Sequence, residues 1–263
     1  MTELQTLLDT GQHALRLARG LISSSQVFDV QSKGDRDMVS NVDQLIEQRV
    51  REFLFRKTPH IGFIGEEEAP GDLSEYNWVL DPIDGTANYL RGIPLYSVAL
   101  SLLREKSTIL GLIDLPYFDQ SYSAIRGSGA FLDDVPIYCS RTAKLGDAIV
   151  AISDFSVEDS PEAENSLLLR VANELSKRVQ RVRLIGSAAI SLAWVADGRF
   201  DAAVILSNKP WDTSAGMLIT NEAGAATSDV LGVLHTLESG SAVAVTPELE
   251  YDLISLLADA VES

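Results

Sequence analysis

The stretch that organises this chain is residues 77–88, which read Asn-Trp-Val-Leu-Asp-Pro-Ile-Asp-Gly-Thr-Ala-Asn. It opens as an apolar run typical of a buried strand. We expect the strand to end at Asp81, because Pro82 fixes its own φ and has no N–H to donate to a strand ladder. Asp84 follows on the same turn, and Gly85 with the threonine after it predicts a short helix. Carboxylates bind hard divalent cations and helix N–H groups bind phosphate, so the turn favours metal-assisted phosphoryl chemistry.

The composition limits the class of protein. With 263 residues, 46% apolar and 22% charged, the chain fits a globular enzyme of one large or two smaller domains. Its net charge of −17, from 38 acidic against 21 basic side chains, disfavours nucleic acid as a partner but permits a small anion beside bound cations. A lone cysteine, Cys139, suits a reducing compartment. The absence of a signal-peptide pattern and of a bilayer-spanning apolar run predicts a cytoplasmic protein without membrane contact.

The first half of the chain predicts helices followed by a meandering sheet. Apolar residues at helical spacing indicate a helix over residues 3–23 and a second helix that follows residues 38–43 and ends at about residue 55. Short strands joined by tight turns indicate antiparallel pairing. The expected strands cover residues 27–32, 60–65, 94–103, 108–114, 120–125 and 130–132.

After about residue 140 the pattern changes to alternating strands and helices, which indicates an α/β arrangement. The expected strands cover residues 148–152, 182–184, 200–206 and 241–245, and the expected helices 161–177, 186–196, 211–222 and 247–261. We therefore expect an N-terminal α+β half, residues 1–140, that carries most of the acidic candidates. A C-terminal α/β half, residues 141–263, would supply Asp212 and the pocket for the leaving group.

Three acidic motifs occur in order along the chain. They are Gly65-Glu66-Glu67, the stretch at 78–89, and Trp211-Asp212-Thr213-Ser214-Ala215-Gly216. These motifs resemble the signatures of the inositol monophosphatase family of lithium-sensitive, magnesium-dependent phosphatases. Further segments that match are Lys33-Gly34, Asp37-Met38-Val39-Ser40-Asn41-Val42-Asp43, Gly127-Ser128-Gly129-Ala130-Phe131-Leu132 and Gly186-Ser187-Ala188. The resemblance spans nearly the whole chain. It implies a layered αβαβα sandwich, a small phosphorylated substrate and a homodimer.

The resemblance also implies a site for two or three Mg²⁺ ions. Glu66, Asp81 and the backbone carbonyl of Ile83 would hold the first ion. Asp81, Asp84 and Asp212 would hold the second, and Glu66 would also touch a third. Magnesium prefers oxygen ligands, and two ions roughly 4 Å apart stabilise both the attacking and the leaving oxygen of an in-line displacement.

The same resemblance assigns Asp43, Glu67 and Thr86 to the attacking water. The hydroxyl of Thr86, hydrogen-bonded to Asp43, would orient the water, and Glu67 would lie close to it. The backbone N–H groups of Gly85 and Thr86 would hold the phosphate, and Lys33 is an accessory candidate that would screen charge near the third ion. Taken alone, Asp43 fits a helix-start residue favoured by the helix dipole, and consecutive glutamates fit a solvated loop.

The leaving-group pocket is where the chain departs from the family. By resemblance, Asp84 and the backbone at Ser187 and Ala188 would contact the substrate. Inositol-specific members have a glutamate that contacts a sugar hydroxyl seven residues before the last metal aspartate, and Ile205 cannot accept that hydrogen bond. Inositol monophosphate is the leading substrate; histidinol phosphate, a sugar phosphate and 3′-phosphoadenosine 5′-phosphate are alternatives. A non-catalytic, metal-binding regulatory homologue is a reading of a different class.

Overall fold

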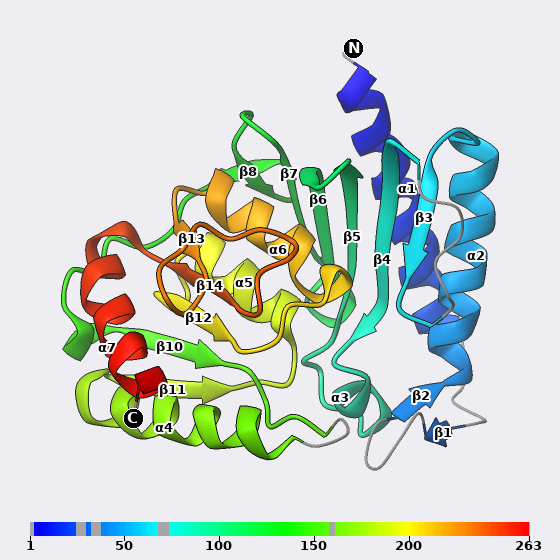
Figure 1. The fold of residues 1–263 in the computed structure, drawn as a ribbon. Coiled ribbons are helices and arrows are strands. Elements are labelled where there is room, and N and C mark those ends of the chain that lie inside the picture. The colour runs from blue at the N-terminus through cyan, green and yellow to red at the C-terminus, as the bar shows by residue number, and fades with distance from the viewer. Residues whose placement is uncertain (1–2, 25–29, 33–37, 68–73, 158–160, 263) are drawn as a thin grey trace.

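Two large β-sheets with helices on their faces, and a small two-stranded sheet, form the described part of the structure, a computed structural model (Figure 1). It describes residues 3–24, 30–32, 38–67, 74–157 and 161–262. The N-terminal half contributes helices α1 (Glu3–Ser24), α2 (Asn41–Lys57) and the short α3 (Thr86–Leu90). Its strands are β1 (Val30–Ser32), β2 (Met38–Ser40), β3 (Gly62–Gly65), β4 (Tyr76–Asp84), β5 (Ser97–Arg104), β6 (Ser107–Leu115), β7 (Gln120–Ile125), β8 (Ala130–Leu132) and β9 (Val135–Ile137).

The C-terminal half alternates strands and helices, as expected. Its helices are α4 (Glu162–Arg178), α5 (Ala188–Ala196), α6 (Pro210–Glu222) and α7 (Glu250–Glu262). Its strands are β10 (Ile149–Ile152), β11 (Arg181–Leu184), β12 (Ala202–Ile205), β13 (Ala226–Ser228) and β14 (Ala242–Val245). The predicted helices of this half are confirmed to within a few residues.

The strand orders differ between the two sheets. The larger sheet runs β3-β4-β5-β6-β7-β8-β9, and every neighbouring pair is antiparallel except β3 with β4. The smaller sheet runs β11-β10-β12-β14-β13, with β10, β11 and β12 parallel. The antiparallel meander predicted for the first half is confirmed.

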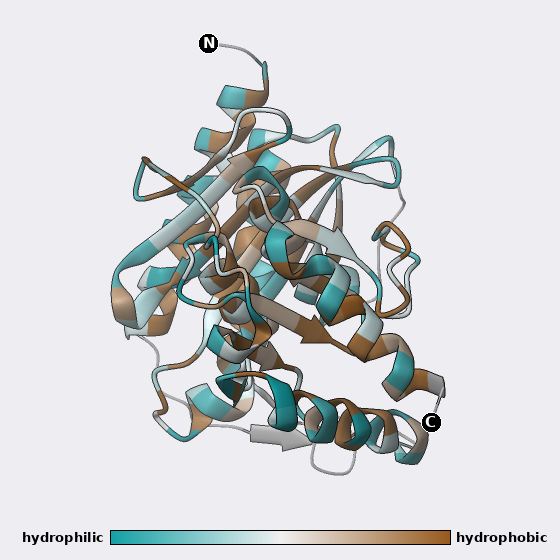
Figure 2. Ribbon diagram, turned by 90° about the vertical axis from the view of Figure 1, so that its left-hand side faces the viewer, coloured by the Kyte–Doolittle hydropathy of each residue, from teal (hydrophilic) through white to brown (hydrophobic). Residues whose placement is uncertain are grey.

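Four groups of buried apolar residues fill the interfaces between five layers. Helices α1 and α2 cover one face of the larger sheet, and α5 with α6 cover its other face. The same α5–α6 layer packs on the inner face of the smaller sheet, whose outer face is covered by α4 and α7. Figure 2 shows hydrophilic and hydrophobic residues alternating along these outer helices. The layers therefore form the predicted αβαβα sandwich.

The period-2 alternation of strand side chains explains how each sheet serves two interfaces. On β12, Ala202 and Val204 belong to the cluster under α4 and α7. Ala203 and Ile205 point the other way, into the cluster shared with α5. This alternation points Ile205 at the α5–α6 layer. Because Ile205 is also the last residue of β12, it lies at the end of the strand where the candidate site is found.

The prediction that the central strand ends at Asp81 is wrong. β4 continues to Asp84, which pairs with Ser97, while Asp81 pairs with Ala99. Three residues of β4 thus span two of β5, which is a β-bulge. The bulge holds Pro82 where the ladder is already interrupted, so the missing N–H does not end the strand.

Other differences are smaller. The strand expected from residue 94 begins at Ser97, and the short strands β9 and β13 were not predicted. Pro136 lies in β9, the edge strand of its sheet, which is where proline is tolerated and where sequence patterns disfavour a strand. Part of the strand expected over residues 27–32 lies outside the described residues.

Candidate active site

The bulge in β4 sets the direction of two carboxylates. In a regular strand, residues three positions apart face opposite sides of the sheet. The extra residue in the bulge puts Asp81 and Asp84 on the same side, the side of the α5–α6 layer to which Ala99 also points. Both carboxylates are buried, at 2% and 8% exposure.

Asp84 binds the N-terminus of α5. Its Oδ2 accepts hydrogen bonds from the N–H of Ala189 at 2.9 Å and the hydroxyl of Ser97 at 3.1 Å, and its Oδ1 accepts from the N–H of Ala188 at 3.2 Å. The hydroxyl of Ser187 also donates to Asp84. A carboxylate is favoured at a helix N-terminus, so α5 and β4 are joined electrostatically at this point. Burial raises the pKa of Asp84, and the hydrogen bond from Ser187 is the largest influence opposing that rise.

Asp43 and Thr86 meet as the sequence predicts. The Thr86 hydroxyl lies 3.0 Å from Oδ1 of Asp43 and 2.9 Å from the carbonyl oxygen of Ile83, so its single proton has two acceptors. Asp43 also forms a capping box with Ser40, whose N–H donates to Oδ2 at 3.0 Å. Asp43 therefore has both roles that the sequence left open: it caps α2 and it contacts the β4–α3 turn.

Gly85 occupies a position that requires glycine. Its φ is 91°, in the left-handed region, and it precedes the first residue of α3. A Cβ at this position would stand 2.8 Å from the carbonyl oxygen of Leu95 and 2.9 Å from that of Gly186. The two halves of the chain therefore come close together at the candidate phosphate-binding turn.

Glu66 and Glu67 follow β3, and a buried glutamate supports them. Glu47 on α2 is 1% exposed, accepts a hydrogen bond from the N–H of Glu67 at 2.9 Å and pairs with Arg51 at 3.2 Å. A Cβ on Gly65 would lie within 2.2 Å of this carboxylate, so glycine lets α2 approach the strand end. Glu47 thus fixes the turn that presents Glu66.

One cavity of about 260 Å³ gathers residues from both halves. Its lining includes Glu66 and Asp84 from the first half and Asp212, from the first turn of α6, from the second. Ser187, Ala188 and Ile205 line the same cavity. Of the other predicted residues, Glu67 lines a separate cavity beside α2, and Lys33 lies outside the described residues.

Asp81 is the centre of the negative charge. Burial raises its pKa, and the carboxylates of Glu66, Asp84, Asp212 and Asp43 raise it further. Its Oδ1 is buried and has no hydrogen-bond partner among the described residues. A buried carboxylate oxygen without a partner is costly, and a cation supplies both the missing contact and the missing charge.

The donor chemistry of the site fits Mg²⁺. The candidate ligands are all oxygen atoms, the type that hard divalent cations prefer. No three His, Cys, Asp or Glu side chains in the described part of the chain already stand in a metal-holding arrangement. Asp84 is turned towards the N-terminus of α5.

Several residues of the site carry no motif that would reveal them. Glu47 and Ser97 act through their contacts with Glu67 and Asp84. Asn88 donates to the carbonyl oxygens of Leu95 at 2.7 Å and Ile185 at 2.8 Å, which ties the two halves together beside Gly85. Asn88 stands in the quoted stretch, but nothing in the sequence shows its partners.

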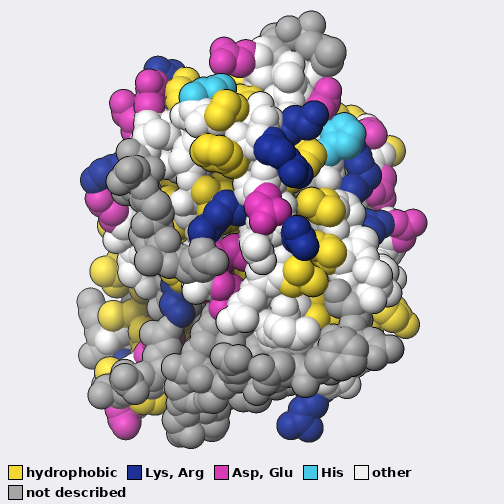
Figure 3. Space-filling model, turned by 90° about the vertical axis from the view of Figure 1, so that its right-hand side faces the viewer, with side chains coloured by type: hydrophobic (Ala, Val, Ile, Leu, Met, Phe, Trp, Pro, Cys, Tyr) yellow, Lys and Arg dark blue, Asp and Glu magenta, His cyan; other side chains and the backbone are white. Residues whose placement is uncertain are grey.

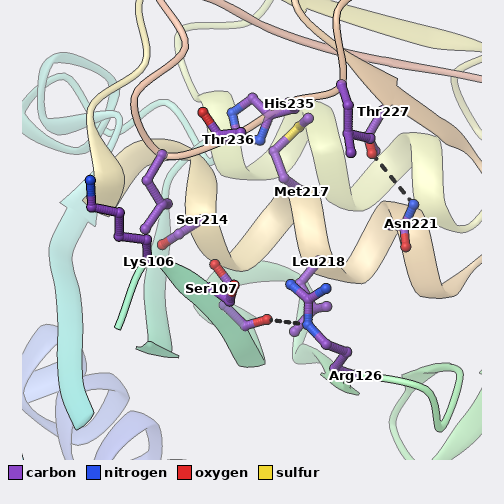
Figure 4. Close-up of a pocket in the computed structure, with 13 residues that line it drawn as sticks. Lys106, Ser107, Arg126, Ser214, Met217, Leu218, Asn221, Thr227, His235 and Thr236 are labelled. Atoms are coloured by element: carbon purple, nitrogen blue, oxygen red, sulfur yellow. Dashed lines mark hydrogen bonds between the residues drawn. The ribbon is translucent and has the colours of Figure 1, made fainter. Parts of the chain in front are cut away.

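A second cavity, of about 280 Å³, lies along α6 (Figure 4). Its polar side chains largely satisfy one another. Lys106 pairs with Glu238, Asn221 donates to Thr227 at 3.4 Å, and the His235 ring lies 3.0 Å from the Asn208 carbonyl group. This cavity therefore lacks the unpartnered buried carboxylate that distinguishes the first one.

The fold and site define a class: an αβαβα protein with an acidic, oxygen-rich pocket between its halves. The chain matches the sequence model of the inositol monophosphatase family over residues 3–262 and belongs to that family. It is 34% identical to an inositol-1-monophosphatase of Mesorhizobium japonicum over 89% of this chain and 88% of that protein. It is 35% identical to a fructose-1,6-bisphosphatase/inositol-1-monophosphatase of Aquifex aeolicus, over 74% and 73%.

Solved structures agree with this assignment. The extragenic suppressor protein SuhB of Bartonella henselae superposes with a TM-score of 0.90 at 28% identity, covering 96% of this chain and 98% of that one. The IMPase of Thermotoga maritima superposes with a TM-score of 0.89 at 26% identity, covering 98% of each. The chain is therefore an enzyme of a phosphatase family. Of the helices in the described segments, none has the length and apolarity to cross a bilayer.

Proposed function

We propose that the protein is a Mg²⁺-dependent phosphomonoesterase that hydrolyses a small alcohol phosphate with a metal-activated water, and that inositol monophosphate is its leading substrate. The observation that carries the proposal is Asp81. This buried carboxylate has an unpartnered oxygen within the described structure and four further carboxylates around it, beside a pocket formed by both halves. Relatives named inositol-1-monophosphatase support the choice of substrate.

The residues that would hold the ions are those expected from sequence. Glu66, Asp81 and the carbonyl of Ile83 would hold one ion, Asp81, Asp84 and Asp212 a second, and Glu66 would contact a third. Bound magnesium supplies Lewis acidity and a lowered pKa for coordinated water. Asp84 has a further task in this chain: through Ser187 and the N–H groups of α5 it fixes the alcohol side of the pocket relative to β4.

Thr86 and Asp43 would position the attacking water. The Thr86 hydroxyl has one proton and two acceptors, Asp43 and the carbonyl of Ile83. With the Ile83 carbonyl holding an ion, the Thr86 proton would go to Asp43, and the hydroxyl oxygen would be free to accept from the water. Glu67 would lie near the same water, since Glu47 holds its backbone. The N–H groups of Gly85 and Thr86 would bind the phosphate.

A phosphate-release panel tests the proposal. Inositol 1-phosphate, histidinol phosphate, fructose 1,6-bisphosphate and 3′-phosphoadenosine 5′-phosphate are assayed with Mg²⁺, with and without Li⁺. We expect Mg²⁺-dependent, Li⁺-inhibited release that is fastest with inositol 1-phosphate. Asp81→Asn should lower kcat at least about 10²-fold, and Asp119→Asn, at an exposed carboxylate, should not. Wild-type turnover by Asp81→Asn would refute the site.

The alternative of a non-catalytic regulatory homologue has a distinct signature. It predicts calorimetric Mg²⁺ binding without phosphate release from any substrate in the panel. Nucleic acid is a poor partner for a chain of net charge −17, and on the face shown in Figure 3 Lys and Arg side chains lie among Asp and Glu side chains.

We also propose that the chain divides into two halves at residue 140, forms a homodimer and is located in the cytoplasm. The two larger sheets fall on either side of residue 140, which supports the division. The second half nevertheless covers one face of the first sheet with α5 and α6, so we expect neither half to be active alone. Light scattering on the purified chain tests the dimer.

A further inference from the structure

Strand ends form one wall of the pocket. β10, β11 and β12 are parallel neighbours. Beyond their carboxyl ends stand Asp154, Gly186 and Ser207, and all three line the pocket. In α/β sheets, ligands bind beyond the carboxyl ends of parallel strands. This wall is therefore placed to contact the alcohol that leaves, not the phosphate.

Asp154 is the carboxylate of this wall closest to the Asp84 contacts. A Cβ built on Gly186 would stand 3.2 Å from Oδ2 of Asp154, so the carboxylate lies directly over the Gly186 backbone. The next residue, Ser187, donates its hydroxyl to Asp84. Asp154 and Asp84 thus lie beside consecutive residues of one short segment of backbone.

The Asp154 carboxylate makes no hydrogen bond or ion pair within the described structure, although its neighbours do. The hydroxyl of Ser153 accepts from the N–H of Leu206 at 3.3 Å, and Asp84 has four donors. Partial burial raises the pKa of Asp154. On the adjacent strand β12, Ile205 also lines the pocket, and its apolar side chain offers no acceptor.

We propose that Asp154 is the residue that selects the leaving alcohol, by accepting hydrogen bonds from the hydroxyl groups of a polyol. The proposal rests on the proposed phosphatase function. A carboxylate that accepts two hydrogen bonds suits neighbouring hydroxyls of a polyol.

The charges of the same wall exclude a second phosphate. Asp154 and Glu164 both line the pocket, against one cation, Lys209. A second phosphate on the leaving group would face this excess of carboxylate charge away from the metal ligands. Bisphosphate substrates are therefore disfavoured, and a neutral polyol is not.

The test compares Asp154→Asn with the wild-type enzyme on two substrates. Inositol 1-phosphate carries hydroxyls on its leaving group, and p-nitrophenyl phosphate carries none. We expect KM for inositol 1-phosphate to rise about tenfold with kcat within about twofold, and both constants for p-nitrophenyl phosphate to stay within about twofold. Asp147→Asn is the matched control, because Asp147 is exposed and precedes the other end of β10.

Three results would overturn the proposal. Equal changes in KM and kcat for the two substrates would show that Asp154 has a structural role. No change for either substrate would show that Asp154 does not contact the leaving group. A preference of the wild-type enzyme for a bisphosphate would contradict the charge argument. If the wild-type enzyme hydrolyses neither substrate, the proposed function fails. The role of Asp154 is then tested by calorimetric titration of both proteins with inositol 1-phosphate. Binding about tenfold weaker to Asp154→Asn supports the proposal, and equal binding overturns it.

Discussion

Ser187 joins α5 to the β4 turn, and replacing it with alanine should be unusually costly for a serine. The hydroxyl accepts a hydrogen bond from the N–H of Ile190 at 3.1 Å and so caps α5. It also donates to Oδ2 of Asp84. The side chain is 5% exposed, so water does not replace these contacts freely.

The expected loss follows from the two contacts. Removing a helix N-cap costs about 1 kcal/mol, and removing a hydrogen bond to a buried charge costs about 1.5–3 kcal/mol. Asp84 keeps the hydroxyl of Ser97 and the N–H groups of Ala188 and Ala189, which limits the second loss. We expect Ser187→Ala to lower the free energy of unfolding by roughly 2–3 kcal/mol. For a chain of this length, that corresponds to a fall in Tm of roughly 5–10 °C.

Calorimetric unfolding of wild-type, Ser187→Ala and Ser191→Ala proteins measures this. Ser191 is the matched control: it is buried on the same helix, one turn later, and its hydroxyl donates only to the backbone oxygen of Ser187, at 2.8 Å. Such a bond contributes little to a helix, so we expect a loss below about 1 kcal/mol. Equal falls in Tm for the two variants would refute the argument that Ser187 links α5 to Asp84.

Two further predictions concern the water-positioning pair and the second cavity. Thr86→Val keeps the shape of the side chain but removes the hydroxyl shared by Asp43 and Ile83, so kcat should fall about 10²-fold with little change in Tm. Thr86→Ser should keep most of the wild-type kcat. A wild-type kcat in the valine variant would contradict this role. Burial lowers the pKa of His235 to about 4, so the folded protein disfavours its proton. Stability should therefore decline as pH falls from about 6.5, the unfolded value, towards 4, by roughly 1–2 kcal/mol after allowance for partial solvation. His235→Gln should flatten this decline in chemical denaturation measured across that pH range, and an unchanged slope would show that His235 is not its source.

The sequence alone predicted most of the secondary structure and the chemistry-bearing residues. Helical periodicity marked α1, α4 and α7, because burial of one face of a helix leaves a repeating pattern in the chain. Short apolar runs between turns marked most strands of the larger sheet, which is buried on both faces. The prediction failed at Pro82, where the local rule says that a strand ends. Strand β4 instead accommodates the proline in a bulge opposite β5, and a pairing partner is not visible in a local pattern.

What the tertiary structure decided is which side chains meet. The acidic motifs could be recognised one by one, but the hydrogen bond from Ser187 to Asp84 joins residues in different halves, and so does the contact of Asn88 with Ile185. Glu47 was predicted only as part of a helix and proved to support the Glu67 turn. Such contacts depend on how five layers dock, because a side chain's partners are set by the packing of distant elements and not by its neighbours in sequence. The turn from Asp81 to Thr86 is thus encoded locally in its residue types, and its charge, burial and partners come from the docking of the other half.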